Sequence, residues 1–180
     1  GSVVTLHHQF AEKLGYRLKN KKRTHDYLDT HLALVLKQFN VDVVFDRFHV
    51  VALLNTAIDE IRRYQQAKCN AVGLKAIQGM RFLLLSNYEK LNPKKQSSLE
   101  CLLEVNKPIA IAHAMKEQIR LFWMRSTVQE GCKFLGWWII DAIESGVEEL
   151  KKTGRTFLRH WQGLTNYFKH KITNGKTEGI

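Results

Sequence analysis

The feature that most constrains the fold is a nearly continuous series of apolar residues at helical spacing, from about residue 50 to residue 170. In its first segment the apolar residues share one face and the charged residues lie opposite. The apolar set is Val51, Leu54, Ile58 and Ile61, and the charged set is Asp59, Glu60, Arg62 and Arg63. The 180 residues contain two prolines, each placed where it can begin a helix and its missing N–H costs little. The chain is therefore predicted to be mainly α.

Signals for helix ends divide the series into further segments. Asn92 before Pro93 is typical of a helix start, and Thr127 with Glu130 forms a T-x-x-E capping box. The expected helices cover about 74–86, 93–105, 108–123, 127–146 and 147–168, the last with a weak point at Gly154. Because these amphipathic segments have short polar joints, we expect residues 50–170 to form one compact bundle.

One short β-strand is predicted in front of the helices. Residues 41–46 (VDVVFD) are rich in β-forming side chains. One strand cannot form a sheet, so we expect its sheet to lie in preceding sequence, and the strand to pair with another copy or lie against the helices. Residues 177–180 resemble the beginning of an element, so we expect a piece of a longer protein. Residues 1–40 are expected to be helical or loop segments without an assigned role.

Charge and composition narrow the class of protein. The net charge is +11, and residues 151–180 hold seven Lys and Arg against one acidic residue. Such an end favours a polyanion partner, most simply nucleic acid. The most apolar stretch, 134–140, is far shorter than the ~20 residues that span a bilayer. Three widely spaced cysteines without a C-x-x-C motif predict buried free thiols and a cytoplasmic protein without a membrane partner.

The segment 43–50 (VVFDRFHV) contains a D-x-x-H motif, and 173–179 contain T-N-G-x-x-E-G. Together they resemble the ISL-type family of bacterial insertion-sequence DDE transposases, and the resemblance covers about residues 40–180. It continues between the two motifs through 53–55, 57–63, 81–85 and 159–161.

The resemblance implies an RNase H-like catalytic core interrupted by a helical insertion. Residues 41–50 would then be the last core strand with the D-x-x-H motif, 51–170 the insertion, and 171–180 the start of a core helix. Such enzymes cleave and transfer DNA strands with two divalent ions, Mg²⁺ or Mn²⁺, held by two Asp and one Glu. The fold class expected is therefore a helical bundle with one short strand and remnants of an α/β core.

The resemblance also implies roles for particular residues. Glu178 matches the family's metal-binding glutamate, and Asp46 and His49 would lie near the catalytic centre without belonging to the triad. The first Asp has no counterpart, and Asp26 or Asp29 could stand for the second. We therefore expect this chain alone to hold no metal and to be inactive.

Plainer interpretations of several residues stay open. Asp46 can cap the next helix with His49 packed beside it, and Glu178 can be an exposed glutamate. Two further groups are predicted to be structural. Surface positions are expected for His7, His8, His25 and His31. Core positions are expected for Trp123, Trp137, Trp138 and Trp161, with an aromatic contact to DNA as the alternative.

The last predicted helix, 147–168 with the residues that follow it, carries a candidate DNA-binding face. At 100° per residue, Lys152, Arg155, Arg159 and Lys169 fall together beside an apolar stripe. That stripe consists of Leu150, Phe157, Trp161, Leu164 and Phe168. Basic side chains so placed suit the phosphates of transposon ends or target DNA, although a solvated surface has the same pattern.

The function of the chain as a whole also has an alternative interpretation. The alternative is a non-catalytic helical domain that binds DNA or protein, left from a decayed transposon. A homodimer is compatible with either interpretation. Upstream strands that end in aspartate would favour the transposase.

Overall fold

The computed structural model describes residues 42–45 and 47–171. This part of the chain contains eight α-helices, one short 3-10 helix and no β-strand. The helices are α3 (Arg47–Lys68), α4 (Ala71–Ile77), α5 (Arg81–Leu85), α6 (Pro93–Val105), α7 (Lys107–Phe122), α8 (Val128–Glu144), α9 (Glu148–Arg159) and α10 (Trp161–His170), with the 3-10 helix η1 at Tyr88–Lys90. The predicted mainly α architecture is confirmed for these residues.

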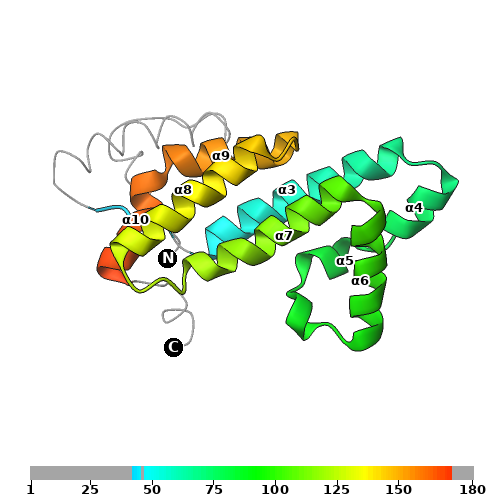
Figure 1. Ribbon diagram of the computed structural model, residues 1–180, viewed down its shortest axis with the longest axis horizontal. Helices are drawn as coiled ribbons and strands as arrows, with labels where there is room; N and C mark the ends of the chain where they lie inside the picture. Colours follow the sequence, from blue (N-terminus) through cyan, green and yellow to red (C-terminus); the bar gives the residue numbers. More distant parts are fainter. Residues whose placement is uncertain (1–41, 46, 172–180) are drawn as a thin grey trace, which may run out of the picture. The chain divides into compact units, whose positions relative to one another are not determined.

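Four long helices form an antiparallel bundle. Helix α3 packs against α7 and α9, and α8 packs against the same two helices, so the four close a ring (Figure 1). The chain runs along α3, returns along α7, and repeats this path through α8 and α9. Helices α4, α5 and α6 form the long connection between α3 and α7. An even number of antiparallel helices returns the chain to the end where it began, and α10 lies at that end.

A single apolar core joins the elements. It includes Leu54 and Ile58 of α3, Phe122 of α7, and Trp138 of α8, all almost completely buried. The indole N–H of Trp138 donates a hydrogen bond to the backbone oxygen of Met115 at 3.0 Å, which ties α8 to α7. The predicted stripe is also largely confirmed, because Leu150, Phe157, Leu164 and Phe168 are buried.

Helix starts follow the local signals. Asn92 caps α6 by accepting a hydrogen bond from the Lys95 N–H at 2.9 Å. The capping box of α8 is present, with the hydroxyl of Thr127 accepting from the Glu130 N–H at 3.1 Å. Asn106 caps α7 in the same way and places Pro108 in the first turn. Each of these signals needs only neighbouring residues.

Two predicted continuous helices are broken. The segment 74–86 contains parts of α4 and α5, separated by Gly79 at φ 77°, a backbone conformation that favours glycine. The segment 147–168 is interrupted at His160 and continuous through Gly154. A Cβ at Gly154 would lie 3.1 Å from the Cβ of Ala142, so this glycine allows α9 to approach α8 closely. The weak point predicted at Gly154 was therefore wrong.

The strand predicted over 41–46 is wrong for the residues that are described, because 42–45 have no strand conformation. Phe45 lies against α10 instead. Its backbone N–H donates to the Gly163 carbonyl at 3.0 Å, and its ring meets His160 edge-on at 4.9 Å between centroids. The surface of α10 thus provides the contacts that a neighbouring strand would provide. The expectation that this segment lies against the helices is confirmed for Phe45.

The three cysteines are free, as predicted. Their predicted burial is wrong, because Cys101 is exposed and the other two are half-buried. In the part of the chain that the structure describes, no helix combines the length and the apolar character needed to cross a membrane.

Candidate nucleic-acid interface

The D-x-x-H segment lies where the chain enters the bundle. His49 is in the first turn of α3 and is exposed, and the neighbouring Phe48 ring is 71% exposed. Asp46 lies outside the described residues. Phe45, directly before it, is held on α10 by the contacts with Gly163 and His160. The chain is therefore anchored on α10 immediately before the motif.

The chain leaves the bundle close to the same point. Gly163 is eight residues before Lys171, which corresponds to about 12 Å along a helix. Helix α10 ends at His170 and is capped by Lys171, whose backbone is left-handed at φ 49° and whose N–H donates to the Tyr167 carbonyl at 2.6 Å. Glu178 lies outside the described residues, as do Asp26, Asp29 and the four N-terminal histidines. The segments that lead to Asp46 and to Glu178 thus begin from one end of the bundle.

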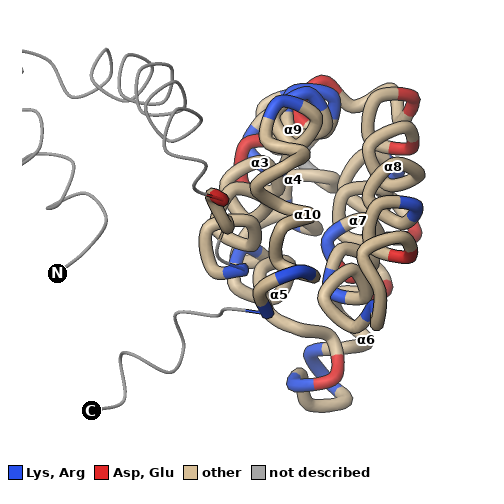
Figure 2. The backbone as a smooth tube through the Cα atoms, turned by 90° about the vertical axis from the view of Figure 1, so that its left-hand side faces the viewer, with Lys and Arg blue, Asp and Glu red and all other residues tan. Residues whose placement is uncertain are grey.

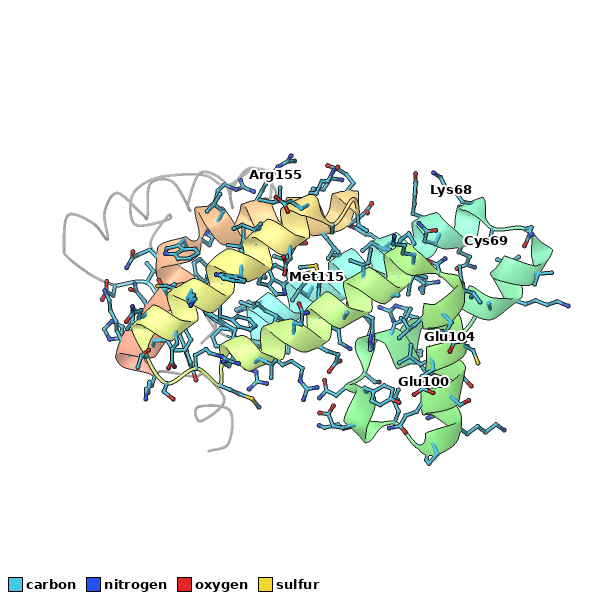
Figure 3. All side chains as sticks on the ribbon, viewed as in Figure 1. Lys68, Cys69, Glu100, Glu104, Met115 and Arg155 are labelled. Carbon is cyan, nitrogen blue, oxygen red and sulfur yellow. The ribbon has the colours of Figure 1, made fainter. Side chains whose placement is uncertain are left out.

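Three of the predicted DNA-binding residues share an exposed face of α9. Lys152, Arg155 and Arg159 are three and four residues apart, and all three are exposed. Figure 2 shows basic segments recurring along α9, and in Figure 3 the Arg155 side chain points away from the bundle. Glu148 lies on the same face, with its carboxylate 3.9 Å from the Arg155 guanidinium. One acidic residue therefore moderates this basic face.

Lys169 does not belong to that face by helical periodicity. The break at His160 separates α9 from α10, so the 100° rule cannot be carried from Arg159 to Lys169. Lys169 is exposed near the end of α10, beside His170 and Lys171. The structure therefore replaces one predicted basic face by a face on α9 and a basic end of α10. Asn166 of α10 is buried at 1% exposure.

The tryptophans divide between core and surface. Trp123 and Trp138 are buried and Trp161 is partly buried, as predicted. Trp137 is 66% exposed on α8, with the Lys133 amine 6.0 Å from its ring centroid, so its predicted core position is wrong. The aromatic contact with DNA stays a prediction for Trp137.

A charged cluster on α3 was not anticipated. Asp59, expected on the solvent side of its helix, is only 6% exposed and contacts three arginines. Arg62 Nε donates to Asp59 Oδ1 at 2.9 Å, and Arg63 Nη2 donates to Oδ2 at 2.7 Å. Arg81 of α5 lies 3.3 Å from Oδ1. The D-x-x-R-R spacing on one helix turn was the available sequence signal.

These contacts control the charge of Asp59. Burial alone raises the pKa of the Asp59 carboxyl, but the hydrogen bonds and charges of Arg62 and Arg63 outweigh it and lower the pKa. The carboxylate is therefore ionised at neutral pH and holds the guanidinium groups in place.

Comparison with known proteins identifies the family. The family model described as a transposase, DDE type of the ISL3 group, matches residues 6–180. The chain belongs to the ISL3 family of DDE transposases. It is also 25% identical, over 142 residues, to the transposase for insertion sequence element IS1001 of Bordetella parapertussis. No solved structure matches the chain.

The match to the Bordetella transposase covers 77% of this chain and 35% of that protein. The chain thus spans about a third of the length of this relative. The match to the ISL3 family model confirms the family that the sequence predicted.

Membership of a DDE transposase family implies a divalent metal ion in the intact enzyme. Among residues 42–45 and 47–171, no group of three or more His, Cys, Asp or Glu side chains could hold such an ion. The helices described here therefore do not fit a two-metal site by themselves.

Proposed function

We propose that this chain is the part of an ISL3-family transposase that carries a helical insertion, and that the whole protein cleaves and transfers DNA strands. The contact between Phe45 and Gly163 is the observation that carries this proposal. An insertion must leave its host fold and return to it at neighbouring points, and this contact brings the start and the end of the bundle together. The described residues from Val44 to Lys171 also belong to one compact unit.

The proposal assigns chemistry to the segments at that end. Glu178 is a metal-binding carboxylate, by its position in the T-N-G-x-x-E-G motif, and Asp46 and His49 lie near the reacting DNA strand. A divalent ion held there, Mg²⁺ or Mn²⁺, would stabilise the negative charge that develops on the phosphodiester oxygens. The exposure of His49 at the start of α3 supports this role, because its side chain is accessible to a ligand.

The basic face of α9 binds the DNA backbone in this proposal. Lys152, Arg155 and Arg159 contact phosphates, and Lys169 extends the contact from the end of α10. Phosphate contacts fix the position of a duplex and carry no base sequence. Selection of the transposon ends therefore belongs to other parts of the protein.

Strand cleavage is tested with the full-length protein on a labelled duplex that carries a transposon end. With Mg²⁺ the wild type is expected to nick the duplex. Glu178→Ala should abolish nicking while duplex binding is retained, and Glu104→Ala, an exposed glutamate of α6, should leave both unchanged. If the full-length wild type binds the duplex and never cuts it, the non-catalytic DNA-binding alternative replaces this proposal.

DNA contact through α9 is tested by the salt dependence of binding. The double substitution Arg155→Ala with Arg159→Ala should weaken binding to all duplexes alike and reduce the slope of log K against log salt by about 2. Lys94→Ala with Lys95→Ala, two exposed lysines of α6, is the matched control. An unchanged slope in the α9 variant would mean that this face is only solvated.

A further inference from the structure

A second group of arginines lies away from the α9 face, between α3 and α5. A cavity of about 240 Å³ opens there. It is lined from α3 by Asn55, Asp59, Glu60 and Arg63, and from α5 by Arg81 and Leu85. The arginines are close enough to Asp59 for that one carboxylate to orient both of them.

The two arginines keep donors for a ligand. Arg63 contacts Asp59 through Nη2 and Arg81 through Nε, whereas a guanidinium has five N–H donors. Their side chains are 70% and 48% exposed, so solvent and ligands can reach them. The guanidinium of Arg81 also lies over the Phe82 ring, 5.5 Å from its centroid, which restricts its position. Both groups are therefore oriented before any ligand arrives.

Asn55 adds an amide to the lining of the cavity. Its Oδ1 atom is buried and has no hydrogen-bond partner. A buried polar atom without a partner is unfavourable unless something else satisfies it. The unpartnered oxygen is an acceptor and does not itself suit an anion, whereas the Nδ2 of the same amide carries N–H donors that an anion in the cavity could accept.

The two arginines that line the cavity balance the charges of Asp59 and Glu60, so an anion would bind through directed N–H donors and not through a net positive charge. Arg62, Arg63 and Arg81 carry three positive charges, and Asp59 and Glu60 carry two negative charges. Arg62 has the least exposed side chain of the three arginines, at 13%, and also donates to Gln66, so it serves mainly to hold Asp59. The guanidinium N–H donors of Arg63 and Arg81 that do not contact Asp59 are of the kind that binds phosphate oxygens.

We propose that Arg63, Arg81 and Asn55 form a binding site for a phosphoryl group, with Asp59 as the residue that orients the two guanidinium groups. The phosphoryl group can belong to a nucleic-acid backbone or to free phosphate. Thr56 and His49 lie seven and fourteen residues before Arg63 on α3, hence on nearly one face at steps of about 10 Å. This alignment leads from the D-x-x-H segment to the site and favours a nucleic-acid strand along α3.

The experiment follows the Nε–H signals of Arg63 and Arg81 by ¹⁵N NMR in the full chain. One arm adds inorganic phosphate and the other adds a short DNA duplex. Shifts with both probes, or with the duplex alone, support a backbone phosphate, and shifts with phosphate alone support a free phosphate ligand. If neither probe moves these signals, the proposal is overturned.

Two variants, one that removes positive charge from the cavity and one that removes negative charge, test the same site through the affinity for the duplex. Arg63→Gln with Arg81→Gln removes one phosphate contact and should reduce the slope of log K against log salt by about 1 for the duplex. Glu60→Gln removes an exposed negative charge from the cavity and should tighten binding about twofold to fivefold. The Glu60 variant keeps the Asp59 contacts, so it tests the site even if the arginine variant unfolds.

Lys75→Gln with Lys107→Gln, two exposed lysines elsewhere, serves as the charge-matched control. Equal slopes for this control and the arginine variant, together with no gain from Glu60→Gln, would show that the cluster is only structural. These measurements do not depend on cleavage, so they can fail while the transposase proposal stands.

Discussion

Replacement of Gly163 by alanine tests the contact that joins the two ends of the bundle. A Cβ on Gly163 would lie 2.2 and 2.3 Å from two carbons of the Phe45 ring, far inside van der Waals contact. Glycine to alanine within a helix normally stabilises a protein by up to about 1 kcal/mol. Here overpacking costs about 1–3 kcal/mol. Displacement of Phe45 also removes its hydrogen bond to the Gly163 carbonyl, worth about 1 kcal/mol. The expected net effect is a loss of about 1–3 kcal/mol.

The assay is urea unfolding of the chain, followed by circular dichroism, in a double-mutant cycle with Phe45→Ala. Without the Phe45 ring, Gly163→Ala should stabilise by about 1 kcal/mol, because only the helix propensity remains. The two backgrounds should therefore differ by about 2–4 kcal/mol. Gly136→Ala is the matched control, because its Cβ would meet the Trp161 ring at 3.6 Å, an ordinary contact. It should be neutral or stabilising.

The reasoning is refuted if Gly163→Ala is as stable as the wild type, or if the effect of the substitution is the same in both backgrounds. Either result would mean that Phe45 does not rest on α10. The insertion proposal would then lose the contact on which it depends.

Two further predictions concern stability. His113 is buried, and its Nε2 has no hydrogen-bond partner among the described groups. Burial is the larger cause that lowers the pKa of His113, and the positive charge of Lys116 lowers it further. The unfolded chain therefore binds this proton at a higher pH than the folded chain does. Stability should fall as the pH drops below about 6.5, and His113→Leu should flatten that dependence in urea unfolding at pH 7 and pH 5. An equal pH dependence in the variant would contradict this. Thr127→Ala removes the acceptor of the α8 capping box and should cost about 1 kcal/mol in urea unfolding, whereas Thr127→Ser should cost much less.

The sequence alone was sufficient for features that depend on neighbouring residues. The helix starts at Asn92 and Thr127 rest on side chains within one turn of each cap. The buried face of α3, with Leu54, Ile58 and Ile61, follows from helical periodicity in the same way. The two motifs also indicated the family, which the comparisons confirm.

For the candidate site the sequence was a partial guide. Periodicity grouped Lys152, Arg155 and Arg159 on an exposed face of α9. Periodicity failed for Lys169 because the chain is not one straight helix from residue 147 to residue 169. Neither glycine nor proline occurs at the break at His160, so the sequence did not indicate that the helix ends there. The roles of Asp46, His49 and Glu178 rest on the motifs and stay predictions.

Tertiary structure decided the features that depend on distant partners. Residues 42–45 have the composition of a strand, but β-propensity expresses fit to a neighbouring surface, and for Phe45 that surface is α10. Asp59 is buried because Arg62, Arg63 and Arg81 neutralise it, and Arg81 comes from another helix. Local patterns determine where helices begin and which face is apolar. The free energy of burying a ring or a charge depends on what lies opposite, and only the folded chain brings those groups together.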